Sequence, residues 1–175
     1  MDLETLKSLL PDTARDLRVN LGNVLKAETL TPAQALGSAL ASALAARSPK
    51  LVAALRPLAQ AHLDETGMKA VETAFALMSM NNIYYRFTHL VSDPEFGTMP
   101  ARLRMQAMAS HGAPPLDFEL WSIAVSAING CGKCLDSHVA KSIKDGVSKM
   151  MVQDTVRIAS VVFAVAAVLD SIPQD

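Results

Sequence analysis

Apolar residues recur along this chain with the spacing of an amphipathic helix. Between about residues 68 and 87, for example, Val71, Ala74, Phe75 and Met78 follow one another three or four positions apart. No segment shows the strict alternation of apolar and polar residues that a half-buried strand requires. The pattern predicts an all-α protein.

Residues that begin and end helices divide the chain into elements. Thr31-Pro32 and Ser48-Pro49 each place an N-cap residue before a proline at the first helical position, which predicts helices over 32–47 and 49–64. Gly67 then opens the gap before the helix over 68–87. The remaining expected elements are a loop over 92–100, a short helix over 101–109, a break over 112–115, a helix over 116–128, a helix from about 131 to 146, and a last helix that Ser148 caps and that ends before Pro173.

A weak internal repeat relates the two halves of the chain. A shift of 84 positions superposes identical residues, namely Leu36 on Leu120, Ser38 on Ser122, Ser42 on Ser126, Ala43 on Ala127 and Leu51 on Leu135. Duplication and chance similarity between Ala-, Leu- and Ser-rich helices both explain it. We expect a single domain over 1–175. With duplication, its first half (about 1–90) is a scaffold and its second half (about 100–175) carries the chemistry.

Composition narrows the class of protein. Hydrophobic residues make up 50% of the chain and charged residues 19%. The mean hydropathy of +0.23 is high for a free monomer of this size and favours an oligomer. A net charge of −1 gives no electrostatic reason to expect nucleic acid. The start lacks the basic region of a secretory signal, and the most apolar segment, 158–169, is too short to span a bilayer. We therefore expect a cytoplasmic protein that does not bind membranes.

The candidate chemistry lies in one short segment of the second half. In a helix, Cys131, Cys134 and His138 at i, i+3 and i+7 share one face. A helix N-terminus and the neighbouring Lys133 both favour the thiolate form of a cysteine. Glu119 lies on the preceding helix, and a break at Asn129-Gly130 would let that helix fold back toward the imidazole. The pattern indicates a proton-coupled redox dithiol.

Each of these residues also has a plainer interpretation. Cys131, Cys134, His138 and Glu119 could together bind zinc, although a structural zinc site usually has a second Cys/His pair. Met78, Met80, Met105 and Met108 are interpreted as core-filling residues, Trp121 as packing between helices, and His62, His89 and His111 as surface or packing residues.

A family resemblance sharpens this prediction. The run Glu119, eleven residues, Cys131-x-x-Cys134, three residues and His138 closely resembles the alkyl hydroperoxidase D (AhpD) proteins of the carboxymuconolactone decarboxylase-like superfamily. The segments 80–86 (MNNIYYR) and 6–20 are also similar to that family, so the resemblance covers essentially the whole chain.

The resemblance implies a compact all-α fold with two related halves, commonly assembled as a homotrimer. It implies reduction of organic hydroperoxides and return of electrons to a partner peroxiredoxin, AhpC. It also implies that no cofactor is bound, because reducing equivalents come from a dihydrolipoyl protein recharged by dihydrolipoamide dehydrogenase. The alternatives are a non-peroxidase member of the same superfamily and a zinc-bound or redox-sensing helical scaffold.

The resemblance also assigns roles to the site residues. Cys134 would be the peroxidatic cysteine that passes through a sulfenic acid, and Cys131 the proton donor and resolving thiol that closes a disulfide with it. His138 and Glu119 would form the proton relay, with Lys133 in a supporting position. Helix-dipole reasoning alone instead favours Cys131 as the nucleophile, because it is nearer the helix start. Some relatives carry a histidine where this chain has Lys133.

Overall fold

The computed structural model describes residues 1–171, and within that range the protein is helical without strands. The helices, in chain order, are α1 (Leu3–Ser8), α2 (Arg15–Val24), α3 (Pro32–Ala45), α4 (Pro49–Gln60), α5 (Glu65–Leu90), α6 (Glu95–Thr98), α7 (Pro115–Asn129), α8 (Gly132–Lys144) and α9 (Lys149–Ser171), with short 3-10 turns η1 (Asp12–Ala14) and η2 (Gln106–Met108). The predicted all-α fold class is confirmed. Pro173, before which the last helix was predicted to end, lies outside the described residues.

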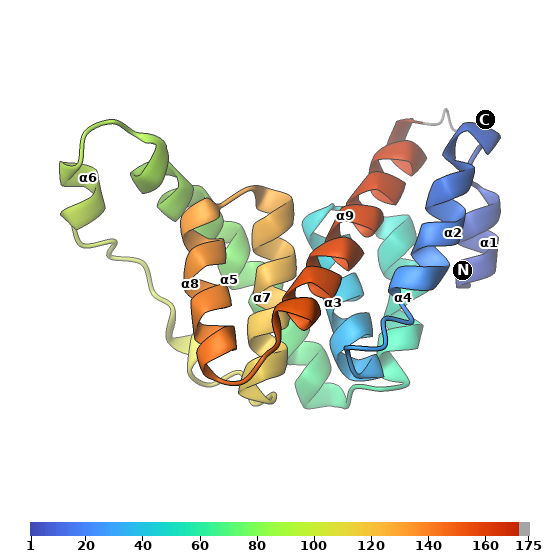
Figure 1. Ribbon diagram of the computed structural model, residues 1–175, viewed down its shortest axis with the longest axis horizontal. Coiled ribbons are helices and arrows are strands. Elements are labelled where there is room, and N and C mark those ends of the chain that lie inside the picture. Colours follow the sequence, from blue (N-terminus) through green and yellow to red (C-terminus); the bar gives the residue numbers. More distant parts are fainter. Residues whose placement is uncertain (172–175) are drawn as a thin grey trace.

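Helix α7 occupies the centre of the fold (Figure 1) and packs against α3, α5, α8 and α9. Its residues Phe118 to Ser126 are all buried, which is the pattern of a helix enclosed by others on every side. Trp121 of α7 lies against Gly37 of α3, where an added Cβ would come within 2.3 Å of the indole Nε1. Trp121 therefore packs between helices, as predicted, and the glycine permits that close contact.

Several helix starts follow the predicted capping chemistry. Thr31 and Gln34 form a capping box, in which each side chain accepts a hydrogen bond from the other residue's backbone N–H. Ser148 Oγ likewise accepts a hydrogen bond from Met151 N at the start of α9. The prediction around Gly67 is wrong, because Asp64 caps α5 by accepting from Gly67 N, so Gly67 lies in the first turn of that helix.

The helix starts repeat along the chain. Helices α7, α8 and α9 begin at Pro115, Gly132 and Lys149, and α3, α4 and α5 begin at Pro32, Pro49 and Glu65, an offset of 83 or 84 residues. The first helices of the two units, α3 and α7, pack directly against each other. This repeated spacing is the spacing that a duplication would produce.

Between the two units the chain forms an arm and a strap. The arm, residues 83–98, is the end of α5 together with α6. Its inner part lies against the end of α7, and its tip with α6 stands away from the other helices (Figure 1). The strap, residues 99–114, returns to α7. The predicted helix over 101–109 is wrong except for η2. Arg102 adopts a left-handed backbone (φ 52°), which interrupts a helix. The predicted loop over 92–100 contains the single turn α6.

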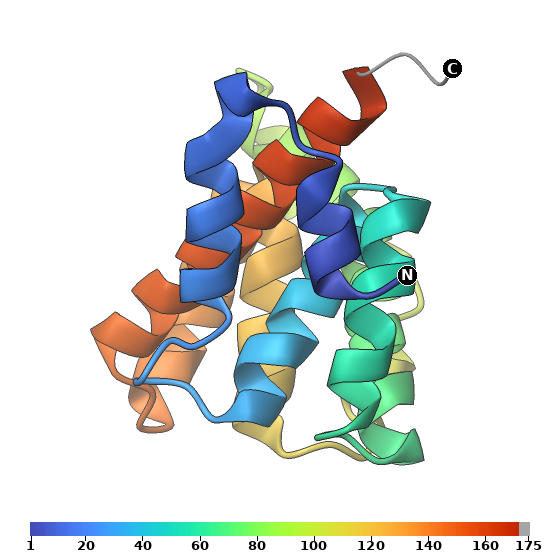
Figure 2. The same ribbon diagram turned by 90° about the vertical axis from the view of Figure 1, so that its right-hand side faces the viewer.

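The N-terminal helices α1 and α2 cover one end of the molecule (Figure 2), where α1 contacts α4 and α2 contacts α9. In the described part of the chain, α9 is long and apolar enough to cross a membrane by length and composition alone. Eight of its residues are buried, and it packs against α2, α3 and α7. It is therefore a packed core helix of this fold, longer than the apolar segment identified from sequence.

Candidate active site

The two cysteines lie at the junction of α7 and α8. Gly130 ends α7 in a left-handed conformation (φ 67°), which glycine adopts without strain. Cys131 is the N-cap of α8, and its sulfur accepts a hydrogen bond from the backbone N–H of Cys134. The two residues are joined by a disulfide, with their Cα atoms 5.3 Å apart. The helix start therefore holds both sulfurs in one turn.

The two sulfurs differ in access. Cys131 is completely buried, whereas Cys134 keeps 6% of its surface exposed and lines a cavity of about 340 Å³. The Cys134 sulfur also lies 3.9 Å from the backbone oxygen of Asn81 on α5. A molecule that enters the cavity meets Cys134 and not Cys131.

A buried histidine and carboxylate lie beside the disulfide. His138 Nδ1 is 2.6 Å from Glu119 Oε2, and both side chains are more than nine-tenths buried. The other ring nitrogen, Nε2, is 3.2 Å from the sulfur of Met78. The helix α7 thus folds back against α8 as predicted and brings Glu119 to the imidazole. His138 faces the carboxylate with one nitrogen and the cavity side with the other.

Lys141 contacts the other oxygen of the Glu119 carboxylate. Lys141 Nζ is 3.3 Å from Glu119 Oε1 and 2.9 Å from Asp145 Oδ2. Burial raises the pKa of Glu119, but the hydrogen bond and charge of His138, reinforced by Lys141, outweigh burial and hold this pKa below its ordinary value. Glu119 is therefore ionised at neutral pH. Because a carboxylate only accepts hydrogen bonds, His138 Nδ1 carries the proton.

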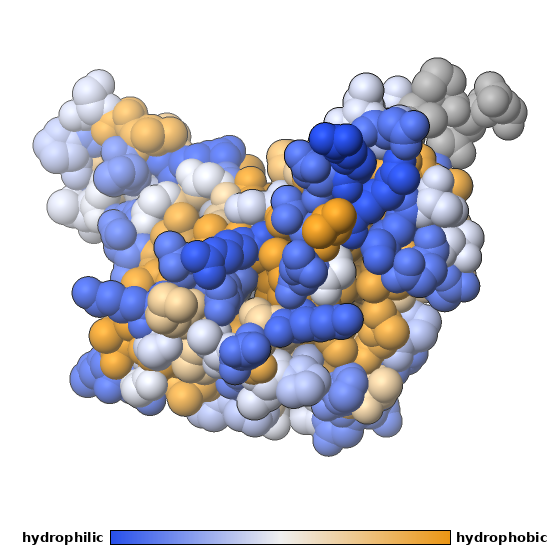
Figure 3. Space-filling model, turned by 45° about the vertical axis from the view of Figure 1, so that its right-hand side comes forward, coloured by the Kyte–Doolittle hydropathy of each residue, from blue (hydrophilic) through white to orange (hydrophobic). Residues whose placement is uncertain are grey.

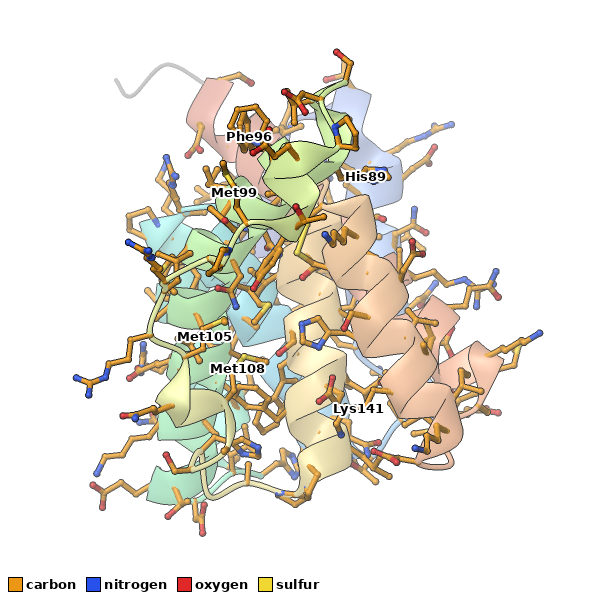
Figure 4. All side chains as sticks on the ribbon, turned by 90° about the vertical axis from the view of Figure 1, so that its left-hand side faces the viewer. His89, Phe96, Met99, Met105, Met108 and Lys141 are labelled. Atoms are coloured by element: carbon orange, nitrogen blue, oxygen red, sulfur yellow. A yellow bond between two sulfur atoms is a disulfide. The ribbon has the colours of Figure 1, made fainter. Side chains whose placement is uncertain are left out.

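The cavity beside Cys134 is mostly apolar and lies between α5, α8 and the strap. Its lining residues are Met78, Asn81, Tyr85, Met105, Met108, Lys133, Cys134, Ser137 and His138. Figure 4 shows Met105 and Met108 on the strap beside α5, and Lys141 where α7 and α8 meet. This arrangement suits an apolar ligand with one polar group directed at Cys134 and His138.

A hydrogen-bond network fixes α5 against the end of α7. Asn82 Nδ2 donates to Ser126 Oγ at 3.0 Å, and Asn129 Nδ2 donates to Asn82 Oδ1 at 3.0 Å. Arg86 donates to the backbone oxygen of Asn129. These bonds lie immediately before Gly130 and Cys131, so they stabilise the turn that presents the sulfurs.

Comparison with known proteins places the chain in a family. The Carboxymuconolactone decarboxylase family model matches residues 94–173. A protein of Solibacter usitatus named alkyl hydroperoxide reductase AhpD is 49% identical over 170 residues, which covers 97% of this chain and 96% of the relative. Proteins of the same name from Streptomyces griseus and Rhodospirillum centenum are 49% and 48% identical, each covering 98% of this chain and 97% and 92% of the relative. The chain belongs to the AhpD family.

In this AhpD family member the structure brings together Cys131, Cys134, His138 and Glu119, the residues singled out from the sequence. The sequence analysis missed residues that surround them. Lys141 and Tyr85 were not singled out, although a lysine three positions after His138 could have indicated a residue on the same helix face. Lys133 lies with its Nζ 5.7 Å from the centre of the Tyr85 ring, at the cavity. His111, interpreted as a surface or packing residue, is stacked on Phe118, and burial lowers its pKa while the nearby Glu119 charge raises it.

The methionine interpretation is correct for only part of its set. Met78 is completely buried in the core, and Met108 packs against the core while also lining the cavity. Met105 is only partly buried and belongs to the cavity wall, so it is not a core-filling residue. His62 and His89 are exposed, as predicted.

Within residues 1–171, no three His, Cys, Asp or Glu side chains lie grouped so that they could hold a metal ion, the four alternative zinc ligands included.

Proposed function

We propose that this chain is an alkyl hydroperoxide reductase that works through a dithiol–disulfide cycle. The observation that carries the proposal is the difference in access between the sulfurs: Cys134 lines the cavity, whereas Cys131 is buried and bonded to it. Kinship with relatives named alkyl hydroperoxide reductase AhpD supports the reaction class.

In the proposed first step, the Cys134 thiolate attacks the outer oxygen of a hydroperoxide ROOH. The O–O bond breaks, Cys134 becomes a sulfenic acid, and the alkoxide leaves as ROH after taking a proton. In the second step, the Cys131 thiol attacks the Cys134 sulfur, forming the disulfide and releasing water. Cys131 is thus the resolving thiol.

Access to substrate, and not the helix dipole, supports Cys134 as the nucleophile. The dipole argument favours Cys131, which is the N-cap of α8, but a completely buried sulfur cannot meet a peroxide. The same N-cap position stabilises a Cys131 thiolate when the disulfide is reduced, because it accepts the Cys134 N–H.

The relay supplies the protons in this cycle. Glu119, ionised, holds His138 by Nδ1, so that Nε2 faces the cavity side and can take a proton from a thiol or pass one to the leaving alkoxide. Lys133, at the cavity beside Cys134, adds positive charge that favours thiolate.

We further propose the redox partners that the family resemblance implies. A dihydrolipoyl protein, recharged by dihydrolipoamide dehydrogenase, reduces the Cys131–Cys134 disulfide by dithiol exchange, and the reduced chain passes electrons to an AhpC peroxiredoxin. The protein binds no cofactor of its own and acts in the cytoplasm, away from nucleic acid and membranes.

We also propose that the chain assembles as a homotrimer. The arm exposes large apolar side chains that a monomer would leave in water, namely Ile83, Phe87, Leu90, Phe96 and, just beyond it, Met99. Figure 3 shows this projecting segment with apolar side chains among polar ones. Contact between copies would cover them.

A coupled assay tests the proposed activity. Purified protein is mixed with dihydrolipoamide, lipoamide dehydrogenase, NADH and cumene hydroperoxide, with and without an AhpC peroxiredoxin. We expect NADH oxidation that requires both the protein and the hydroperoxide, and that stops when the reduced protein is alkylated with iodoacetamide. Absence of hydroperoxide-dependent oxidation in both arms, or activity insensitive to alkylation, would overturn the proposal.

A further inference from the structure

Lys141 joins the buried carboxylate of the site to the surface of the protein. Its ammonium lies 3.3 Å from Glu119 Oε1, while Glu119 Oε2 is held by His138 Nδ1 at 2.6 Å. Each carboxylate oxygen therefore has one charged or polar partner on α8. His138 and Lys141 are three positions apart on that helix and thus project from the same face.

We propose that Lys141 is a positioning residue of the relay: it holds the second oxygen of Glu119, keeping the carboxylate ionised and its first oxygen directed at His138. This inference deepens the proposed function and rests on it. Lys141 does not line the cavity and so does not meet the substrate. Its effect on the reaction passes through Glu119.

The burial of Glu119 is the physical reason for this role. A carboxylate only 6% exposed loses most of its hydration, which favours the neutral acid. A neutral Glu119 could donate a proton and would no longer fix the tautomer of His138. The contact with the Lys141 ammonium offsets the lost hydration of the carboxylate. It also restrains rotation of the carboxylate about its terminal bond, which a single hydrogen bond does not.

Lys141 is itself held in place. Asp145, one helical turn further along α8, accepts a hydrogen bond from Lys141 Nζ at 2.9 Å, and this contact raises the pKa of Lys141. Lys141 is half-exposed, so its ammonium stays hydrated while it reaches inward to Glu119. Lys141 thus links the exposed carboxylate of Asp145 to the buried carboxylate of Glu119.

Other charged groups near Glu119 are few in the described structure. From α8 they are His138 and Lys141, and from the segment before α7 there is His111, whose pKa the Glu119 charge raises and burial lowers. Lys144 acts on Asp145 but does not contribute to the pKa shift of Glu119. Lys144 therefore offers a matched control on the same helix.

The first experiment compares pH profiles of kcat/KM for hydroperoxide reduction in K141M, K141R and K144M. Loss of Lys141 raises the pKa of Glu119, so we expect K141M to lose about three- to tenfold of its activity at pH 5 and to approach the parent near pH 8. K141R keeps the cation and should follow the parent, as should K144M. Parental activity of K141M throughout would overturn the inference, and an equal loss at every pH would overturn the role of Lys141 in keeping Glu119 ionised.

The second experiment does not depend on enzymatic activity. The Glu119 carboxyl is titrated by 13C NMR in the oxidised protein, as the parent, K141M and K144M. We expect a higher midpoint in K141M only, with the thermal midpoint of all three within about 2 °C. An unchanged Glu119 midpoint in K141M rejects the positioning role even if the protein is a peroxidase. A raised midpoint in a protein without peroxidase activity keeps the electrostatic role and rejects the proposed function.

Discussion

His138 connects Glu119 to the cavity through its two ring nitrogens. Nδ1 lies 2.6 Å from Glu119 Oε2, and Nε2 lies 3.2 Å from the sulfur of Met78, which lines the cavity with Cys134. The imidazole is therefore fixed at one end by a buried anion and open at the other to a soft, polarisable neighbour. In the proposed relay, Nε2 is the nitrogen that exchanges protons on the cavity side.

Stability should depend on the ionisation of Glu119. The folded-state pKa of Glu119 is depressed below its ordinary value of 4.5, so its contribution is present above that pH and is lost as the pH falls through the folded value. We expect E119Q to lower the free energy of unfolding by about 1–3 kcal/mol at pH 7. Urea titrations from pH 7 to pH 3 should show the gap between parent and variant narrowing below pH 4.5. A gap that widens there would contradict this assignment.

The two cysteines should give different phenotypes. We expect C134S to lose peroxide turnover entirely. C131S should react once with hydroperoxide and stop at a Cys134 sulfenic acid, because the resolving thiol is absent. Dimedone labelling followed by mass spectrometry distinguishes the two. Labelling at residue 131 in C134S, with none at residue 134 in C131S, would reverse the proposed roles.

The strap methionines should set substrate preference. Met105 and Met108 form part of the cavity wall, and within residues 1–171 neither is hydrogen-bonded to Cys131 or Cys134. We expect M105A/M108A to lower kcat/KM for cumene hydroperoxide by about tenfold, through lost apolar contact, and to affect tert-butyl hydroperoxide less. Steady-state kinetics with both substrates checks this. Equal losses would indicate damage to the chemistry instead of the wall.

How far the sequence predicts this protein depends on the range of the interactions involved. Local chemistry at Thr31, Ser148 and Gly130 predicted where helices begin or end, because those caps depend on a few neighbouring residues. The strap was mispredicted because its composition is compatible with a helix, whereas the left-handed backbone of Arg102 interrupts a helix there and η2 packs on α5.

The site shows the same division. The spacing of Cys131, Cys134 and His138 along one helix was readable, and the break at Gly130 indicated that Glu119 could fold back. The cavity could not be predicted from the sequence, because Tyr85 and Met105 come from segments distant in sequence. Their contact depends on tertiary packing. Lys141 was missed because a lysine on a helix is ordinarily a solvated residue.

The contact between α3 and α7 should be intolerant of added volume. A Cβ on Gly37 would lie 2.3 Å from Trp121 Nε1, and the buried indole has no room to withdraw. We expect G37A to lose about 1–3 kcal/mol of unfolding free energy. G22A is the matched control, since an added Cβ in α2 meets only Lys7 Nζ at 3.7 Å, and it should be neutral or stabilising by up to about 1 kcal/mol. Chemical denaturation measures both, and equal stabilities would refute the close contact.

The arm should control assembly. Phe87 and Phe96 pack edge to face with ring centres 5.2 Å apart, and they are 47% and 37% exposed. We expect F87S/F96S to shift the protein from trimer toward monomer in sedimentation velocity, while far-UV circular dichroism stays unchanged. V19S, at an exposed apolar residue of α2, serves as a control. A monomeric parent would refute the trimer, and a variant that stays trimeric would exclude the arm from the interface.

The unequal exposure of the two sulfurs constrains the order of the proposed cycle. Because Cys131 is sealed and only Cys134 faces the cavity, the oxidant and the dithiol reductant must approach the same sulfur through the same opening. The oxidant and the reductant cannot occupy this opening at the same time. Each can therefore bind only after the product of the other has left. The kinetics that follow are ping-pong, with each substrate inhibiting at high concentration by occupying the form of the enzyme meant for the other.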